Sequence, residues 1–269
     1  MIMKTVLTLV DFSEVSVNAL SFAAELCKRA SARLVIVNIL HKGDDEDAKN
    51  MLSAIESGLK KTFGADLNCE SSVVHGDLIP TLKKIIAVQQ PDLIVMGTKG
   101  ASGLKKILIG SNTVNVIANT KVPVLVIPAT ARFDHFLDKG KNKIVLATDL
   151  DILEHDEALN ILKEIALLVI EPKIRVLSVR PENTELPELK RMERDFLISI
   201  FDPEIESKRI TVFSDNVISG INFYLNQKKE TGLLAMIARD SGGLIKKHYT
   251  REMASHTHFP LLVLHDAKI

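Results

Sequence analysis

A glycine-rich stretch in the first half of the chain has the composition of a phosphate-binding loop. Gly97 and Gly100 follow a run of apolar residues, and Gly110-Ser111 opens the next helical segment. Glycine lets a ligand approach the backbone, and the free N–H groups at a helix start attract anions. The spacing therefore predicts a phosphate cradle in which the Ser111 hydroxyl donates to a phosphate oxygen. The structural alternative is a tight turn in which Ser111 is only the N-cap of the helix.

Asp11 and Ile39 give a second signal, because each stands at the predicted carboxyl end of a strand. Ligands of open parallel sheets bind at that edge. Asp11 could accept a hydrogen bond from a base or a ribose, and Ile39 could offer its backbone and side chain to an adenine ring. Both residues also have ordinary structural explanations. Asp11 could cap the following helix, alone or together with Ser13, and Ile39 could be a core residue.

Short apolar runs alternate with longer amphipathic segments in the first half, which predicts an α/β unit. Strands are expected near 4–10, 33–40, 68–74, 92–96 and 123–127, and helices near 14–30, 46–63, 78–88 and 112–120. Runs such as Leu93-Ile94-Val95-Met96 are apolar at every position, as in parallel sheets that are covered on both faces. The glycine stretch directly follows the fourth of these strands, and Asp11 directly follows the first.

The second half repeats the pattern of the first. Three of its segments align in the same order with segments of the first half: 142–149 with 4–11, 232–244 with 92–104, and 259–264 with 122–127. Such a repeat indicates a duplication, so we predict two tandem domains, 1–132 and 140–269, joined by a polar stretch. Strands of the second domain are expected near 143–148, 174–179, 209–213, 232–237 and 260–264. The charged middle of this half, 180–208, gives no clear element.

These motifs together resemble the universal stress protein family. The residues that carry the resemblance are Val10-Asp11-Phe12-Ser13, Pro91-Asp92-Leu93-Ile94-Val95-Met96-Gly97-Thr98-Lys99-Gly100, Gly110-Ser111 and Val122-Pro123-Val124-Leu125-Val126. The resemblance covers essentially the whole first half, and the glycine spacing is that of the family's ATP-binding members. It implies two tandem five-stranded parallel-sheet α/β sandwich domains with strand order 3-2-1-4-5, which form an internal pseudo-dimer.

The resemblance also implies which residues hold a nucleotide. Adenine would lie near Asp11 and the main chain of Ile39. The phosphates would lie near Met96, Gly97, Gly100, Gly110, Ser111 and Asn112. Members of this kind bind ATP, which we expect together with Mg²⁺, as a sensing or regulatory ligand in stress responses with little or no turnover.

The second half departs from the family pattern at the phosphate positions. In the ungapped alignment Ile237 and Asp240 replace Gly97 and Gly100, and the Gly-Ser pair is absent. A carboxylate beside a polyanion is unfavourable by roughly 1 to 4 kcal/mol per charge pair. Asp149 is retained at the end of the first strand. We therefore expect nucleotide in the first domain, and a scaffold role or a different ligand in the second.

Other polar groups give weaker hints. His75 and Asp77 could form an acid/base pair, but a polar turn after the third strand explains them as well. His256 and His258 could bind zinc, but no third ligand is evident and surface histidines are the simpler explanation. The glycine loop has no nearby carboxylate for magnesium and no base for water, so we expect no enzyme, although slow ATP hydrolysis remains open.

Composition limits the partners. Lys plus Arg and Asp plus Glu each total 34, and aromatic residues make up 4 %, so neither a basic field nor a stacking surface favours nucleic acid. No apolar run approaches the roughly 20 residues of a membrane span. Cys27 and Cys69 are too few for a disulfide framework and suit a reducing compartment. We expect a cytoplasmic protein without nucleic-acid or membrane partners.

Two functions are consistent with the sequence. The preferred one is a stress-response protein that binds ATP through its first domain. The alternative is a nucleotide-independent interaction or scaffold module, which would act through its sheet edges and its second domain by self-association or with a protein partner.

Overall fold

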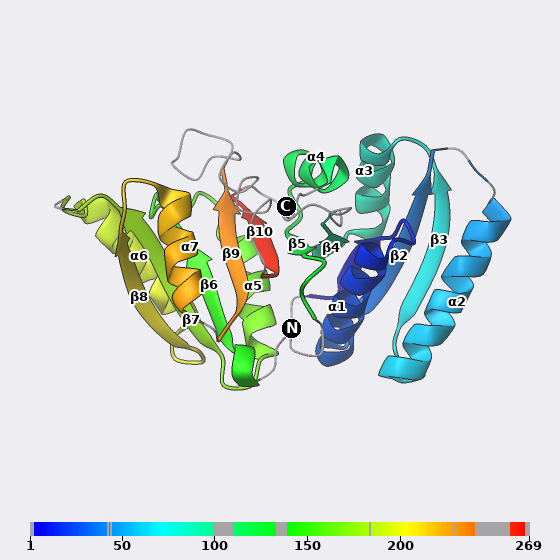
Figure 1. The fold of residues 1–269 in the computed structure, drawn as a ribbon, viewed down its shortest axis with the longest axis horizontal. Coiled ribbons are helices and arrows are strands. Elements are labelled where there is room, and N and C mark those ends of the chain that lie inside the picture. Colours follow the sequence, from blue (N-terminus) through cyan, green and yellow to red (C-terminus); the bar gives the residue numbers. More distant parts are fainter. Residues whose placement is uncertain are drawn as a thin grey trace. The chain divides into compact units, whose positions relative to one another are not determined.

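The computed structural model describes residues 3–41, 43, 45–98, 110–132, 139–182, 184–228, 230–239 and 259–266. The chain divides into two compact units, Met1–Phe133 and Asp134–Ile269. Figure 1 shows the helices and strands of each unit.

The first unit is built on parallel strands connected by helices. Its strands are β1 (Thr5–Leu9), β2 (Arg33–Leu40), β3 (Cys69–His75), β4 (Leu93–Gly97) and β5 (Val124–Ile127), in the order β3-β2-β1-β4-β5. Each neighbouring pair in this unit runs parallel. Its helices are α1 (Glu14–Ala30), α2 (Asp45–Phe63), α3 (Leu78–Gln89) and α4 (Ser111–Asn119). The strand order predicted for the first domain is therefore present.

The second unit repeats this arrangement. Its strands are β6 (Lys143–Ala147), β7 (Lys173–Arg180), β8 (Glu206–Phe213), β9 (Thr231–Ala238) and β10 (Leu261–His265), in the order β10-β9-β6-β7-β8. Its helices are the short η2 (Lys139–Lys141), α5 (Glu157–Leu167), α6 (Glu188–Phe201) and α7 (Val217–Gln227). Helix α6 lies in the segment that the sequence left without an element. Its Leu197 and Phe201 are fully buried, while its exposed residues are both charged and apolar.

The predicted α/β class with parallel strands is confirmed. The described residues contain ten strands, and their description as two separate five-stranded sheets is not confirmed. The internal pseudo-dimer and the assignment of 1–132 and 140–269 to two domains of one family stay predictions. No helix among the residues described is both long and apolar enough to span a membrane.

Burial explains why the central strands are continuous apolar runs. All of β1 and the first four residues of β4 are buried, as expected for strands that are covered on both faces. By contrast, β3 at the end of the order is buried at none of its positions. Helix α1 begins at the N-cap Ser13 and ends at Ser31, whose left-handed backbone turns the chain into β2.

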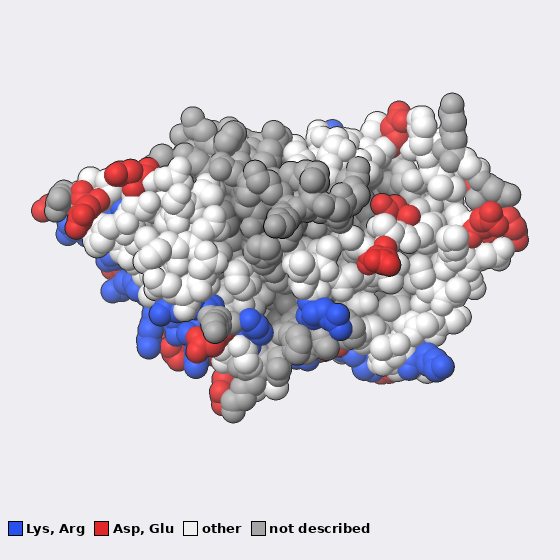
Figure 2. Space-filling model, viewed as in Figure 1, with Lys and Arg blue, Asp and Glu red and all other residues white. Residues whose placement is uncertain are grey.

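Charge in the first unit follows the direction of the helices. Helices α1 and α2 carry Glu14 and Asp45 in their first turns and Lys28 and Lys60 in their last turns, which complements their dipoles. Figure 2 shows the result, with Lys and Arg of this unit mostly along the lower edge and Asp and Glu mostly higher up. Helix α4 differs, because no acidic residue lies in its first turn.

Strand β9 of the second unit contains a bulge at Gly232. The partners along β6 step from Lys143↔Thr231 to Ile144↔Leu233, so Gly232 is the extra residue. A Cβ at this position would lie 2.1 Å from the carbonyl oxygen of Lys141. The backbone of residue 141 therefore excludes any side chain at the bulge.

We expect Gly232→Ala to lower the free energy of unfolding by about 1 to 3 kcal/mol, because the Lys141 carbonyl has to move. Urea-induced unfolding followed by circular dichroism measures this change. Gly140→Ala is the matched control, because a Cβ there meets nothing within 4 Å and should change stability by less than about 0.5 kcal/mol. An equal loss in both variants would contradict the steric argument.

Candidate functional site

The carboxyl ends of β1, β2 and β4 meet the start of α4 at one pocket of about 700 Å³ in the first unit. Seven of the eight residues predicted to bind nucleotide line this pocket: Asp11, Ile39, Met96, Gly97, Gly110, Ser111 and Asn112. The eighth, Gly100, lies outside the described residues. Parallel pairing thus brings together residues that are far apart in the sequence, and their role in binding stays a prediction.

Asp11 is held by the first turn of α1. Its Oδ1 accepts hydrogen bonds from the Ser13 amide at 3.1 Å and the Ser13 hydroxyl at 2.6 Å. Ser13 Oγ in turn accepts from the Ser16 amide and caps α1. Partial burial raises the pKa of Asp11, but hydrogen bonds from Ser13 and Ser16 outweigh burial and hold that pKa below its usual value. Asp11 therefore supports the helix start, as the structural explanation expected, and still presents an ionised carboxylate to the pocket.

At the opposite end of the pocket, the first N–H groups of α4 have no side-chain cap among the described residues. Gly110 is the N-cap, and it has no side chain to satisfy the first N–H groups of the helix. Ser111 is the first helical residue, so the explanation of Ser111 as the N-cap is wrong. The hydroxyl of Thr113 donates to the Gly97 carbonyl at 2.9 Å and ties the helix to the end of β4. An uncapped helix start without acidic residues is the kind of site that attracts an anion.

Gly97 has a packing role that the sequence did not reveal. A Cβ there would lie 2.7 Å from both Cγ1 and the carbonyl oxygen of Val15, so the glycine lets α1 approach β4 closely. A Gly97→Asp substitution would consequently disturb this packing as well as an anion site. The next residue, Thr98, is 1 % exposed, lines the pocket, and has a hydroxyl without a hydrogen-bond partner among the described residues. Sequence reasoning also missed Thr98, although it directly follows the predicted glycine.

The hypothesis of a His75–Asp77 acid/base pair is wrong. The His75 ring contacts Asp45, and Asp77 instead pairs with His41, whose Nδ1 lies 3.0 Å from Oδ1 of Asp77. Asp77 is also the N-cap residue of α3, which agrees with the polar-turn explanation. His256 and His258 lie outside the described residues, as does Asp240. Within the described ranges, no group of three or more His, Cys, Asp or Glu side chains could hold a metal ion.

The second unit places a buried ion-pair network where the first unit has its carboxylate. Asp149 lies two residues after β6 as Asp11 lies two residues after β1, and the residues that follow them, Leu150 and Phe12, both have a left-handed backbone. The guanidinium of Arg239 pairs with Asp149 and also contacts Asp266 Oδ2 at 3.2 Å.

These three side chains are nearly inaccessible to solvent, with 7 % of Arg239, 4 % of Asp149 and 6 % of Asp266 exposed. Arg239 also donates to the Asp151 carbonyl at 2.6 Å. Asp149 is therefore committed to an internal partner, unlike Asp11. The sequence signal for this difference is the arginine that aligns with Lys99.

Glu193 of α6 adds a third buried carboxyl group to this network. Burial raises the pKa of Glu193 above its usual range, and the charges of Asp266 and Asp149 act in the same direction, while Arg239 opposes them. Oε1 of Glu193 has no hydrogen-bond partner among the described residues. Glu193 therefore keeps its proton to a higher pH in the folded chain than an unperturbed glutamate would.

Comparison with known proteins finds similarity to universal stress proteins. Residues 3–128 match the sequence model of the Universal stress protein family. Universal stress protein MJ0577 of Methanocaldococcus jannaschii is 35 % identical over 82 residues, which are 30 % of this chain and 49 % of that protein, so the match spans about half of this relative. A universal stress protein from Archaeoglobus fulgidus DSM 4304 has a related fold with a TM-score of 0.70 at 20 % identity, and the likeness covers 99 % of this chain and 100 % of that chain. A universal stress protein solved in complex with cAMP is 22 % identical, with a TM-score of 0.38 over 47 % of this chain and 98 % of that chain.

The fold is α/β, and in the first unit a pocket lies at the carboxyl edge of parallel strands. The domain at residues 3–128 is similar in sequence to universal stress proteins, as its motifs predicted.

We expect Arg239→Met to lower the free energy of unfolding by about 3 to 5 kcal/mol, because it leaves Asp149 and Asp266 buried without their cation. Arg209→Met is the matched control. Arg209 is 51 % exposed and pairs with Asp195 at 3.0 Å, so its loss should cost less than about 1 kcal/mol. Urea unfolding compares the two variants. Losses of unfolding free energy of similar size would show that the buried network contributes no more to stability than the exposed pair.

Glu193 should make the second unit less stable as pH rises. Because its pKa is raised in the folded state, the folded chain keeps a proton that the unfolded chain releases above about pH 4.5. Stability attributable to this group is present below that pH and is lost as pH rises through the folded pKa. Glu193→Gln should therefore flatten the decline in unfolding free energy that begins above about pH 4.5. Glu188→Gln, on the exposed side of the same helix, should keep the original profile, and identical profiles in both variants would refute the assignment.

Proposed function

We propose that the first unit binds ATP as a sensing or regulatory ligand in a stress response, with little or no turnover. The observation that carries this proposal is the pocket that joins Asp11 and Ile39 to the uncapped start of α4. Its volume of about 700 Å³ falls within the range of pockets that hold ligands of this size.

The two ends of the pocket suit the two ends of a nucleotide. Near β1 and β2, Val10 and Ile39 provide apolar surface for a ring, and the Asp11 carboxylate provides a hydrogen-bond acceptor for a base or a ribose. At the other end, the N–H groups of α4 and the Ser111 hydroxyl provide donors for phosphate oxygens. The phosphates and water would together supply most of the ligands for Mg²⁺.

Low turnover is supported by the residues at the phosphate end. Hydrolysis needs a base or a polar group that orients the attacking water. Gly110, Ser111, Asn112 and Thr113 contain no basic or acidic side chain, and the carboxylates of the pocket, Asp11 and Glu14, come from the other end. The described part of this site therefore favours binding over catalysis.

The second unit supports a stoichiometry of one nucleotide per chain. Arg239 neutralises Asp149 and lies at the end of β9, the strand equivalent to β4. Together with Ile237 in place of Gly97, this arrangement removes both the free carboxylate and the open backbone that the first unit offers.

The alternative, an interaction module that acts without nucleotide, is favoured by one surface of the second unit. Leu189, Met192 and Phe196 of α6 are 61 %, 63 % and 43 % exposed. Their spacing places them along one side of the helix. Such an apolar stripe is typical of a surface that packs against another protein.

Isothermal titration of nucleotide-stripped protein with ATP and Mg²⁺ tests the proposal, and we expect about one ATP per chain. Ser111→Asp should weaken binding by at least about tenfold, because it places a negative charge beside the phosphates. An aspartate in the first turn of α4 favours the helix itself, so this variant should remain folded.

Asn119→Asp is the control, since it adds the same charge at the exposed far end of α4 and should leave the affinity unchanged. Equal ATP affinities in both variants would show that the phosphates do not bind at the start of α4. No binding by folded, nucleotide-free protein would refute the proposal and favour the interaction module.

A further inference from the structure

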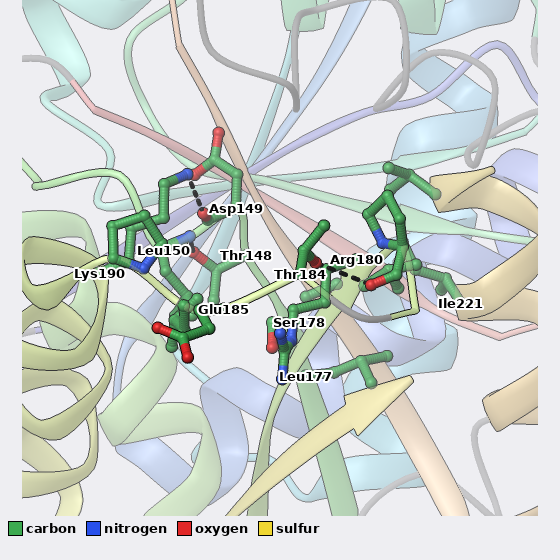
Figure 3. Close-up of a pocket in the computed structure, with 16 residues that line it drawn as sticks. Thr148, Asp149, Leu150, Leu177, Ser178, Arg180, Thr184, Glu185, Lys190 and Ile221 are labelled. Carbon is green, nitrogen blue, oxygen red and sulfur yellow. Dashed lines mark hydrogen bonds between the residues drawn. The ribbon is translucent and has the colours of Figure 1, made fainter. Parts of the chain in front are cut away.

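We infer that the second unit has a separate binding site for a small, uncharged and mainly apolar molecule. The site is a cavity of about 250 Å³ at the carboxyl ends of β6 and β7. Figure 3 shows its side chains, among them Thr148 and Asp149 after β6, Leu177 and Ser178 of β7, and Ile221 of α7. This inference does not require nucleotide binding in the first unit.

The cavity occupies the place of only one end of the first unit's pocket. Its residues Ala147, Thr148, Asp149, Val179 and Val217 are the positional counterparts of Leu9, Val10, Asp11, Ile39 and Leu78, which line the first pocket. The counterparts of Met96, Gly97 and Thr98 are Met236, Ile237 and Ala238, which are described and do not line the cavity. The cavity of the second unit, beside β6 and β7, thus corresponds to the end of the first pocket beside β1 and β2. The end of the first pocket at β4 has no counterpart in this cavity, because the equivalent residues of β9 do not line it.

A longer loop forms the outer wall of this cavity. Residues 181–187 connect β7 to α6, whereas the equivalent connection from β2 to α2 is the shorter 41–44. Pro181, Thr184, Leu186 and Pro187 of the longer loop line the cavity. The Thr184 hydroxyl donates to the Pro181 carbonyl at 2.7 Å, drawn as a dashed line in Figure 3, and the two prolines restrict the backbone.

The charged groups around the cavity already have partners or face solvent. Asp149 pairs with Arg239, and Lys190 donates to the Asp149 carbonyl at 2.8 Å and contacts Asp151 Oδ1 at 2.6 Å. The Arg180 guanidinium lies 5.0 Å from the ring centroid of Phe213, and Glu185 is exposed. A charged ligand would have to compete with these contacts, so an uncharged ligand is favoured.

Ser178 supplies one polar anchor inside this mainly apolar cavity. The residue is 7 % exposed, it lines the cavity, and its hydroxyl has no hydrogen-bond partner among the described residues. At the equivalent position in the first unit, Asn38 uses its amide to donate to the Val10 carbonyl at 2.7 Å. A ligand with one hydrogen-bonding group would satisfy the Ser178 hydroxyl.

The volume limits the ligand to a fragment-sized molecule. A closed apolar cavity of about 150 Å³ holds a single benzene ring. The cavity of about 250 Å³ in the second unit thus suits a bicyclic ring system. Indole, with two fused rings and one N–H donor, matches this size and chemistry, and indene has the same shape without the polar group.

Titration of the full chain with indole and with indene, followed by calorimetry and ligand-observed NMR, tests this inference. We expect saturable binding of one indole per chain, which an excess of ATP and Mg²⁺ does not displace. Ser178→Ala should weaken indole by about threefold to tenfold, the value of one hydrogen bond, and should leave indene unchanged.

Val179→Phe should fill the cavity and abolish binding of both probes, with urea unfolding used to verify the fold. Ile39→Phe is the matched control in the first unit and should leave both probes bound. Absence of saturable indole binding to the original chain would overturn the inference. Binding that survives Val179→Phe, or that ATP displaces, would also overturn it, and these outcomes differ from a failure of ATP to bind the first unit.

Discussion

The parallel pairing of β1 with β2 on one side and β4 on the other is the constraint on which the site depends. Val6 pairs with Leu34 and with Leu93, so all three strands run in the same direction. Their carboxyl ends therefore meet at one edge, where the following helices also begin. A carboxylate after β1, an apolar side chain at the end of β2 and a glycine at the end of β4 are brought together by this register alone.

The helix starts at this edge explain the electrostatic character of the pocket. Helix α1 is capped by Ser13 and carries Glu14 in its first turn, so its positive end is largely neutralised. Helix α4 has neither a capping side chain nor an acidic residue there. An anion in the pocket would thus be directed toward α4 and away from Asp11. The polarity of the site arises from which helix start the sequence leaves uncapped.

Periodicity and strand order were predictable from the sequence because they follow from apolar runs and from a recognisable repeat. The predicted ranges 33–40 and 14–30 coincide with β2 and α1. Helix α6 was missed because only a few of its residues are buried, and apolar residues on its exposed side together with the buried Glu193 obscure the amphipathic pattern. The packing of Gly97 against Val15 could not be predicted from the sequence. A glycine at this position is equally consistent with close packing of a helix on the strand and with contact between the backbone and a ligand. Arg239 was missed because its partner Asp266 is distant in the chain.

The two units differ at the same edge of the sheet although their strand order is equivalent. Once Arg239 neutralises Asp149, the carboxylate is satisfied internally and no longer needs a ligand donor. The longer β7–α6 loop then covers the adjoining apolar surface with prolines. Without Arg239, the buried Asp149 carboxylate would be unpaired, and without the longer loop, the apolar surface would be uncovered. Both situations are unfavourable. Together, Arg239 and the longer loop give the second unit a smaller cavity beside a neutralised carboxylate, where the first unit has a larger pocket beside Asp11.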